Sequence, residues 1–147
     1  MKTVEISSQF PVPADAVWER VRRTSTLFQV TAGLVEFLDL EQFPEYWQTG
    51  TEITTRLRLF NRLPGGLYHI KVQAVEPEDR RIVTLEHGGL VREWQHEMRV
   101  DEISPSSCRY VDRVWVDAGV LSQPLQYYVR WYYRQRHERW QSVLGLQ

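Results

Sequence analysis

Five strand-like runs separated by short turn sequences fill residues 51–117, and they constrain the fold more than any other feature of this sequence. Apolar and polar residues alternate along the runs, as is typical of strands with one buried face. The runs are 51–60, 67–76, 81–87, 92–103 and 107–117. The sequences between them, NRLPGG, PEDR, GGL and SPSS, are rich in turn-forming residues. Because such short links force neighbouring strands to be antiparallel, the sequence predicts an antiparallel meander.

The residues before the meander predict a strand followed by short helices. Residues 3–10 alternate as a strand does, and residues 12–23 form an amphipathic helical pattern with Pro13 in the first turn. The apolar side of that helix is expected to pack by Val17, Trp18 and Val21. Residues 25–34 are compatible with a second short helix, and 35–40 read as a strand.

A helix of more than five turns is predicted after the meander. It should begin near Ser122, which can cap it, carry Pro124 in its first turn, and end at Gly145. A sheet of this kind must cover one apolar face, and the last helix is the only long element available for that role. The order of elements therefore predicts an α+β fold in which the sheet packs on the C-terminal helix.

Helical phase separates the apolar and basic residues of this last helix. The expected core-facing stripe consists of Leu121, Leu125, Tyr128, Val129, Tyr132, Trp140 and Val143. The opposite, solvated face is expected to carry Arg130, Arg134, His137 and Gln141. Nucleic-acid binding would need rings and arginines on one exposed surface, and the net charge of −1 provides no field for a polyanion. Nucleic acid is therefore not an expected partner.

Arg136 and Arg139 break this separation, because helical phase places both inside the apolar sector. Such an arginine must pair with an acid, reach around to solvent, or face a cavity that holds water or ligand. Arg136 lies nearer the centre of the stripe, and it is therefore the better candidate for a residue that faces a cavity.

Two polar residues of the meander are candidates for the same cavity. Alternation places His96 on the face of its strand that carries Trp94 and Met98, and Asp112 with Cys108 and Tyr110. Whether the two faces coincide depends on the register across the SPSS turn, because one residue of slip exchanges them. If they coincide, Asp112 would orient His96, and Arg136 of the last helix would lie over both. A buried structural network and a ligand-orienting cluster are both compatible with this pattern.

Four aromatic residues are the expected walls of a pocket, although aromatic side chains at such positions also form ordinary cores. They are Tyr68, Trp94, Tyr128 and Tyr132. The four histidines lack metal-ligand spacing, Cys108 is the only cysteine, and no glycine-rich phosphate loop is present. Neither a metal nor a cofactor is therefore expected.

Length and composition predict one globular domain over residues 1–147, of which 42% are hydrophobic. The first ten residues have no apolar core of the kind that an export signal needs, and no run of eighteen apolar residues occurs. The expected location is therefore cytoplasmic, without a membrane span.

Several of these segments together resemble the SRPBCC superfamily, the START-like or polyketide cyclase/dehydrase-like domains. The segments are PADAVWERV after the first strand, GTEITTRLRL, GGLVREWQHEMRV, YVDRVWVDAG and YYRQRHERW. The resemblance implies a helix-grip (START/Bet v 1-like) fold over nearly the whole chain, with a cavity between sheet and helix for a lipid-like or polycyclic molecule. The chain resembles the bacterial ligand-binding branch, in which a strand with a histidine is followed by a D-x-V strand and then by a helix with basic residues. On that match, His96, Asp112 and Arg136 occupy these positions.

Three functions are compatible with such a domain. The leading hypothesis is non-catalytic binding of a small hydrophobic molecule. The second is a polyketide cyclase or dehydratase in which His96 is the general acid/base, Asp112 orients it, and Arg136 stabilises an oxyanion. The third is a protein-interaction module with a closed core. The fold hosts carriers, enzymes and regulators alike, and it does not by itself choose among them.

Overall fold

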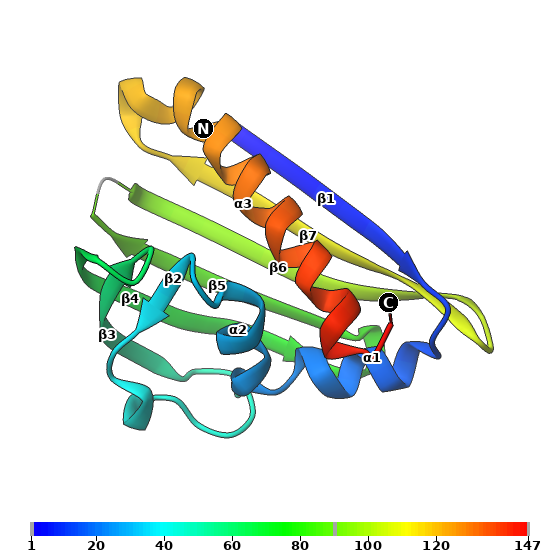
Figure 1. The fold of residues 1–147 in the computed structure, drawn as a ribbon. Coiled ribbons are helices and arrows are strands. Elements are labelled where there is room, and N and C mark those ends of the chain that lie inside the picture. The colour runs from blue at the N-terminus through cyan, green and yellow to red at the C-terminus, as the bar shows by residue number, and fades with distance from the viewer. Residues whose placement is uncertain (1, 90, 147) are drawn as a thin grey trace.

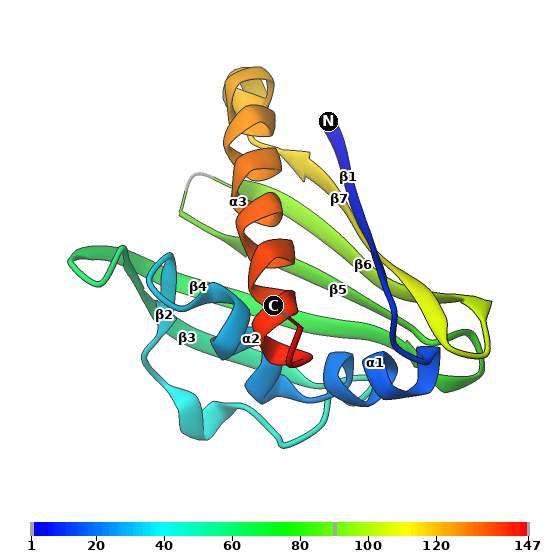
Figure 2. The ribbon, with the colours of Figure 1, turned by 45° about the vertical axis from the view of Figure 1, so that its right-hand side comes forward.

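A curved antiparallel sheet grips the long C-terminal helix in the computed structural model, which describes residues 2–89 and 91–146 (Figures 1 and 2). The strands are β1 (Lys2–Phe10), β2 (Val35–Phe37), β3 (Glu52–Leu59), β4 (Leu63–Glu76), β5 (Arg81–Gly88), β6 (Val91–Ser104) and β7 (Ser107–Asp117). The α-helices are α1 (Ala14–Val21), α2 (Thr24–Thr31) and α3 (Ser122–Val143). The short 3-10 turns are η1 (Leu40–Gln42), η2 (Pro77–Asp79) and η3 (Gly119–Leu121). This architecture confirms the predicted helix-grip fold.

The sheet is a meander to which the first strand has been added at one edge. Its strand order is β1-β7-β6-β5-β4-β3-β2. The pairing of β1 with β7 runs from Lys2 opposite Val116 to Phe10 opposite Cys108. α3 packs mainly against β1 and α2 and has fewer contacts with β7. The concave surface of the central strands is therefore left facing space beneath the helix.

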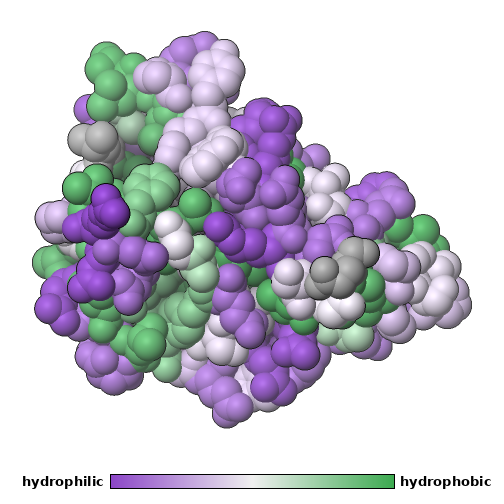
Figure 3. Space-filling view, viewed as in Figure 1, coloured by the Kyte–Doolittle hydropathy of each residue, from purple (hydrophilic) through white to green (hydrophobic). Residues whose placement is uncertain are grey.

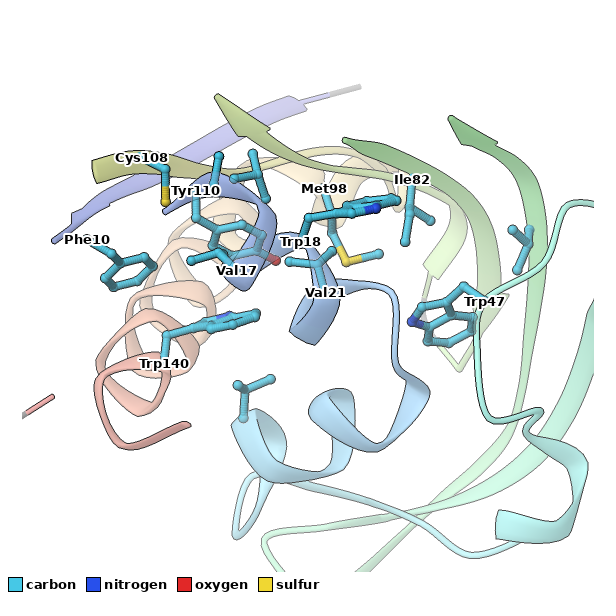
Figure 4. Packing of buried hydrophobic residues seen from close by; sticks show 14 of the residues in the cluster. Phe10, Val17, Trp18, Val21, Trp47, Ile82, Met98, Cys108, Tyr110 and Trp140 are labelled. Atoms are coloured by element: carbon cyan, nitrogen blue, oxygen red, sulfur yellow. The ribbon is translucent and has the colours of Figure 1, made fainter. Parts of the chain in front are cut away.

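The larger of two hydrophobic clusters in the described residues includes the place where the C-terminal end of α3 meets the sheet and α1 (Figure 4), and the smaller one packs around Val129 and Tyr133 of α3. The ring of Trp140 packs against Tyr110 and Phe10, with centroid separations of 4.8 and 6.3 Å. The predicted apolar side of α1 is buried here, since Val17 and Trp18 belong to this core. One end of the domain is thus solidly packed.

The two ends of α3 are closed by different means. At the C-terminal end Gly145 has a φ of 74°, and its N–H donates to the carbonyl of Ser142 at 3.1 Å. The N–H of Leu146 donates to the carbonyl of Gln141 at 2.7 Å, which completes a Schellman motif at the predicted stop. The predicted cap at Ser122 is wrong, because its Oγ accepts a hydrogen bond from the backbone N–H of Ala118 at 2.8 Å. That bond ties the start of the helix to the end of β7.

The turn between β3 and β4 is tighter than the sequence suggested. It lies at Phe60 and Asn61, with φ angles of 52° and 59°, and β4 already begins at Leu63. Much of the stretch read as a turn therefore belongs to a long strand.

The helical-phase prediction for α3 is wrong at three positions. His137, assigned to the solvated face, is only 5% exposed, whereas Leu121 and Tyr128, assigned to the core stripe, are 44% and 41% exposed. Because α3 touches β1 on one side and α2 on another, its buried arc is wider than a single stripe. The row that begins at Tyr133 and continues at His137 is buried for this reason.

Ile82→Ala should lower the free energy of unfolding by about 2–5 kcal/mol, because Ile82 is fully buried on the concave face and its removal leaves a cavity. The matched control is Ile103→Ala near the end of β6, where the side chain is 50% exposed and the cost should stay below about 1 kcal/mol. Urea unfolding of both variants measures the difference. Equal losses in the free energy of unfolding for the two variants would contradict the observation that Ile82 is buried and Ile103 is exposed.

Candidate functional site: a pocket beneath the C-terminal helix

The register of the β6–β7 hairpin answers the question that the sequence left open. Met98 pairs with Asp112 and His96 pairs with Val114, so the even-numbered residues of both strands share one face. That face is the concave one, and His96 and Asp112 are 3% and 1% exposed. The imidazole and the carboxylate are therefore brought together beneath α3.

Asp112 accepts hydrogen bonds from three side chains. His96 donates from Nε2 to Oδ1 at 2.6 Å, and the Tyr110 hydroxyl donates to the same oxygen at 2.9 Å. His137 of α3 donates from Nε2 to Oδ2 at 2.8 Å. An ionised carboxylate is a pure acceptor, and this arrangement fixes Nε2 of both imidazoles as protonated.

The network continues to the edge strand. The Ser8 hydroxyl of β1 lies 2.7 Å from Nδ1 of His137, to which it donates when the imidazole is neutral. Hydrogen bonds thus connect β1, α3, β7 and β6 through Ser8, His137, Asp112 and His96. Burial opposes the charge on Asp112, but the two imidazoles and their hydrogen bonds outweigh it and hold the pKa of that carboxyl far below its ordinary value.

A pocket of about 530 Å³ lies between the concave face of the sheet, α2 and α3. Most of the residues selected from the sequence line it: Tyr68, Trp94, His96, Tyr128, Tyr132 and Arg136. Asp112 does not line it, because its carboxylate is enclosed behind His96 and Tyr110. The pocket wall therefore presents His96, while Asp112 holds it from behind.

Glu86 is a pocket residue that the sequence reasoning missed. Its carboxylate accepts hydrogen bonds from the hydroxyl of Tyr68 at 2.6 Å and from that of Thr84 at 2.5 Å. Its Oε2 lies 4.0 Å from Nδ1 of His96. Burial, with the adjacent carboxylate, raises the pKa of the Tyr68 hydroxyl well above its ordinary value. Alternation along β5 places Ile82, Thr84 and Glu86 on one face, and this was the available signal.

Arg136 is buried in the pocket wall without a carboxylate partner in the described part of the chain. Its guanidinium lies over the ring of Tyr133 at 4.7 Å and that of Tyr132 at 5.7 Å. Its Nε is buried and has no hydrogen-bond partner. Burial works against the charge, but nearby oxygens of Tyr133, Tyr132 and Asp112 outweigh it and raise the pKa of Arg136 above its ordinary value. Arg136 therefore stays charged.

The pocket reaches the surface near the N-terminal half of α3. Two of its lining residues, Phe60 and Tyr128, are 43% and 41% exposed. In Figure 3 hydrophobic residues gather over the β2–β4 end of the molecule and near the start of α3. An apolar molecule would meet an apolar rim at this opening.

Two further classes of site receive no support from the geometry. Within residues 2–89 and 91–146, no three His, Cys, Asp or Glu side chains are grouped in a way that could hold a metal ion. Each helix of the described ranges is too short or too polar to cross a membrane.

Solved structures that share this fold include the following three. A START superfamily protein from Mycobacterium smegmatis has a TM-score of 0.71 at 12% identity, and the match covers 97% of each chain. The di-domain ARO/CYC protein BexL from the BE-7585A biosynthetic pathway has a TM-score of 0.69 at 16% identity, covering 95% of this chain and 45% of BexL. Norcoclaurine synthase from Thalictrum flavum, in complex with dopamine and hydroxybenzaldehyde, has a TM-score of 0.62 at 17% identity, covering 84% and 76%.

The sheet, the gripped helix and these likenesses define an SRPBCC-type, START-like fold, as the sequence resemblance implied. A search of curated proteins finds no match to the sequence. A family model matches residues 8–144, and the chain belongs to that family, which is described as Domain of unknown function (DUF8410).

Asp112→Asn should lower the free energy of unfolding at neutral pH by about 3 kcal/mol, because it weakens the partner of two buried imidazoles. Since the folded-state pKa of Asp112 lies below its ordinary value of 3.8, its contribution is fully present above that value. The contribution is lost as the pH falls through the folded-state pKa. The wild-type advantage over the variant should therefore shrink below about pH 4.

Urea unfolding at a series of pH values measures this advantage. The control is Asp15→Asn, whose side chain is 84% exposed and which should change the free energy of unfolding little at any pH. A wild-type advantage that stayed constant down to about pH 2 would contradict the role assigned to Asp112.

Proposed function

We propose that this protein binds a small, largely apolar molecule in the pocket between the concave face of the sheet and α3. The observation that carries the proposal is the pocket itself, with a volume of about 530 Å³. Pockets that take small ligands usually measure about 300–1,000 Å³ and have apolar walls with a few fixed polar groups. The lining here fits that description.

The lining divides into apolar walls and a small polar part. α2 contributes Leu27 and Val30, and the strands opposite contribute Leu57 and Ile70. The polar part consists of His96, Glu86 and Arg136, each held by its own neighbours. Such a division suits a ligand that is mostly apolar and carries polar groups at defined positions.

The packing favours binding of a lipid-like or polycyclic ligand and disfavours a protein-interaction module with a closed core. On α3, Trp140 packs into the core and borders the pocket, while Tyr128, Tyr132 and Arg136 line the open volume beside it. A protein-interaction module with a closed core would have no need of that volume. Binding is therefore the better-supported function.

Catalysis is the second candidate, and the position of His96 favours it. His96 lines the pocket, and its Nε2 is bound by Asp112, so its Nδ1 is the nitrogen left for proton transfer. The Tyr133 hydroxyl lies 3.5 Å from Nδ1. BexL, which is similar in fold, is described as an ARO/CYC protein. Multiple turnover of a poly-β-ketone substrate, lost in His96→Asn and kept in His87→Asn, would establish an enzyme.

Leu27→Trp should weaken binding of the neutral fluorescent probe N-phenylnaphthylamine at least tenfold. Leu27 lies on α2 at the pocket wall, and the larger indole would occupy space that the probe needs. Fluorescence titration of wild type and variant measures the two dissociation constants.

The matched control is Leu40→Trp, which makes the same change at a residue that is 54% exposed. It should leave the affinity for the probe unchanged. Equal affinity of Leu27→Trp and wild type, or no saturable binding to wild type, would sink the proposed binding function.

A further inference from the structure

We propose that the ligand is an organic monoanion whose carboxylate is bound by Arg136, with its apolar body in the rest of the pocket. This inference rests on the proposed binding function and names the chemical class of the ligand.

The polar atoms that lack partners reveal what the pocket is missing. In the described residues, three buried side-chain nitrogen or oxygen atoms have no hydrogen-bond partner: Nε1 of Trp94, Nε of Arg136 and Nε1 of Trp140. All three are N–H donors, and all three residues line the pocket. Buried indole and guanidinium N–H groups normally find an acceptor. The missing group is therefore a hydrogen-bond acceptor.

Arg136 determines that this acceptor should carry negative charge. The residue is 5% exposed, and burying an arginine without a directly paired carboxylate is costly. Its position over Tyr133 and Tyr132 offsets only part of that cost, since a cation–π contact is weaker than a charge-assisted hydrogen bond. A bound anion would supply the remainder.

The acids near Arg136 already have other partners. Asp112 is enclosed by His96, His137 and Tyr110, and no ion pair joins it to Arg136 in the described ranges. Glu86 accepts hydrogen bonds from Tyr68 and Thr84. No hydrogen bond or ion pair therefore joins Arg136 to either carboxylate in the described residues, although the charge on Asp112 acts on it through space.

A guanidinium that no acid contacts directly favours a ligand with one negative charge. A doubly charged phosphate would bring an excess charge into an apolar pocket, where desolvation is expensive. A carboxylate also matches the planar fork of a guanidinium, to which it can bind through two parallel hydrogen bonds. Because the remaining walls are mostly aliphatic and aromatic, the rest of the ligand should be apolar.

The test compares two fluorescent probes of nearly equal shape, pyrenebutanoate and its uncharged carboxamide. Wild type should bind the acid about 10–100-fold more tightly than the amide, because only the acid forms charge-assisted hydrogen bonds with Arg136. Arg136→Met should remove this preference while leaving the affinity for the amide and the melting temperature nearly unchanged. Arg136→Lys should retain part of the preference.

The matched control is Arg134→Met, an exposed position on the same helix, which should keep the full preference. Equal binding of acid and amide by wild type would overturn the inference and leave the binding function standing. A preference for the acid that survives in Arg136→Met would also overturn the inference and leave the binding function standing. Failure of wild type to bind either probe or the neutral probe above would instead count against the binding function itself.

Discussion

The buried carboxylate of Asp112 is the interaction on which the rest of this structure depends. It is 1% exposed and is held by His96 of β6, Tyr110 of β7 and His137 of α3. Ser8 extends the same network to β1. A charge in this position is tolerated only because three donors surround it, and any displacement of α3 would break one of them. The network therefore fixes how the helix lies over the sheet, and with it the shape of the pocket.

The polar groups beneath α3 are divided between an enclosed hydrogen-bond network and the wall of the pocket. Asp112 and His137 are enclosed and satisfied, and they hold elements together. Arg136, one residue before His137, turns toward the pocket and has no acid partner in the described ranges. His96 belongs to both sets, since Nε2 joins the network while the imidazole lines the pocket. The sequence offered a buried network and a ligand-orienting cluster as alternatives, and the structure contains both a buried network and pocket-lining polar residues, on adjacent positions.

The sequence predicted what local periodicity can encode. Alternation and short turns predicted the antiparallel meander. Gly145 predicted the end of α3, because the Schellman motif there needs a residue with a positive φ angle. The faces of β6 and β7 were also predictable within each strand, whereas their common register depends on pairing across the hairpin. His137 was misplaced because the buried arc of α3 is set by β1 and α2 together, and a phase calculation on one helix contains no information about its neighbours.

The central claim is that Arg136 is not the ion-pair partner of Asp112, and that the two charges interact only through space. A double-mutant cycle on Asp112→Asn and Arg136→Met, followed by urea unfolding at neutral pH, tests it most directly. We expect a coupling free energy of about 1 kcal/mol or less, because the two side chains form no ion pair and interact only through space. A coupling of about 3 kcal/mol would show that Arg136 is the counter-ion of a buried acid, and would contradict its assignment to the ligand.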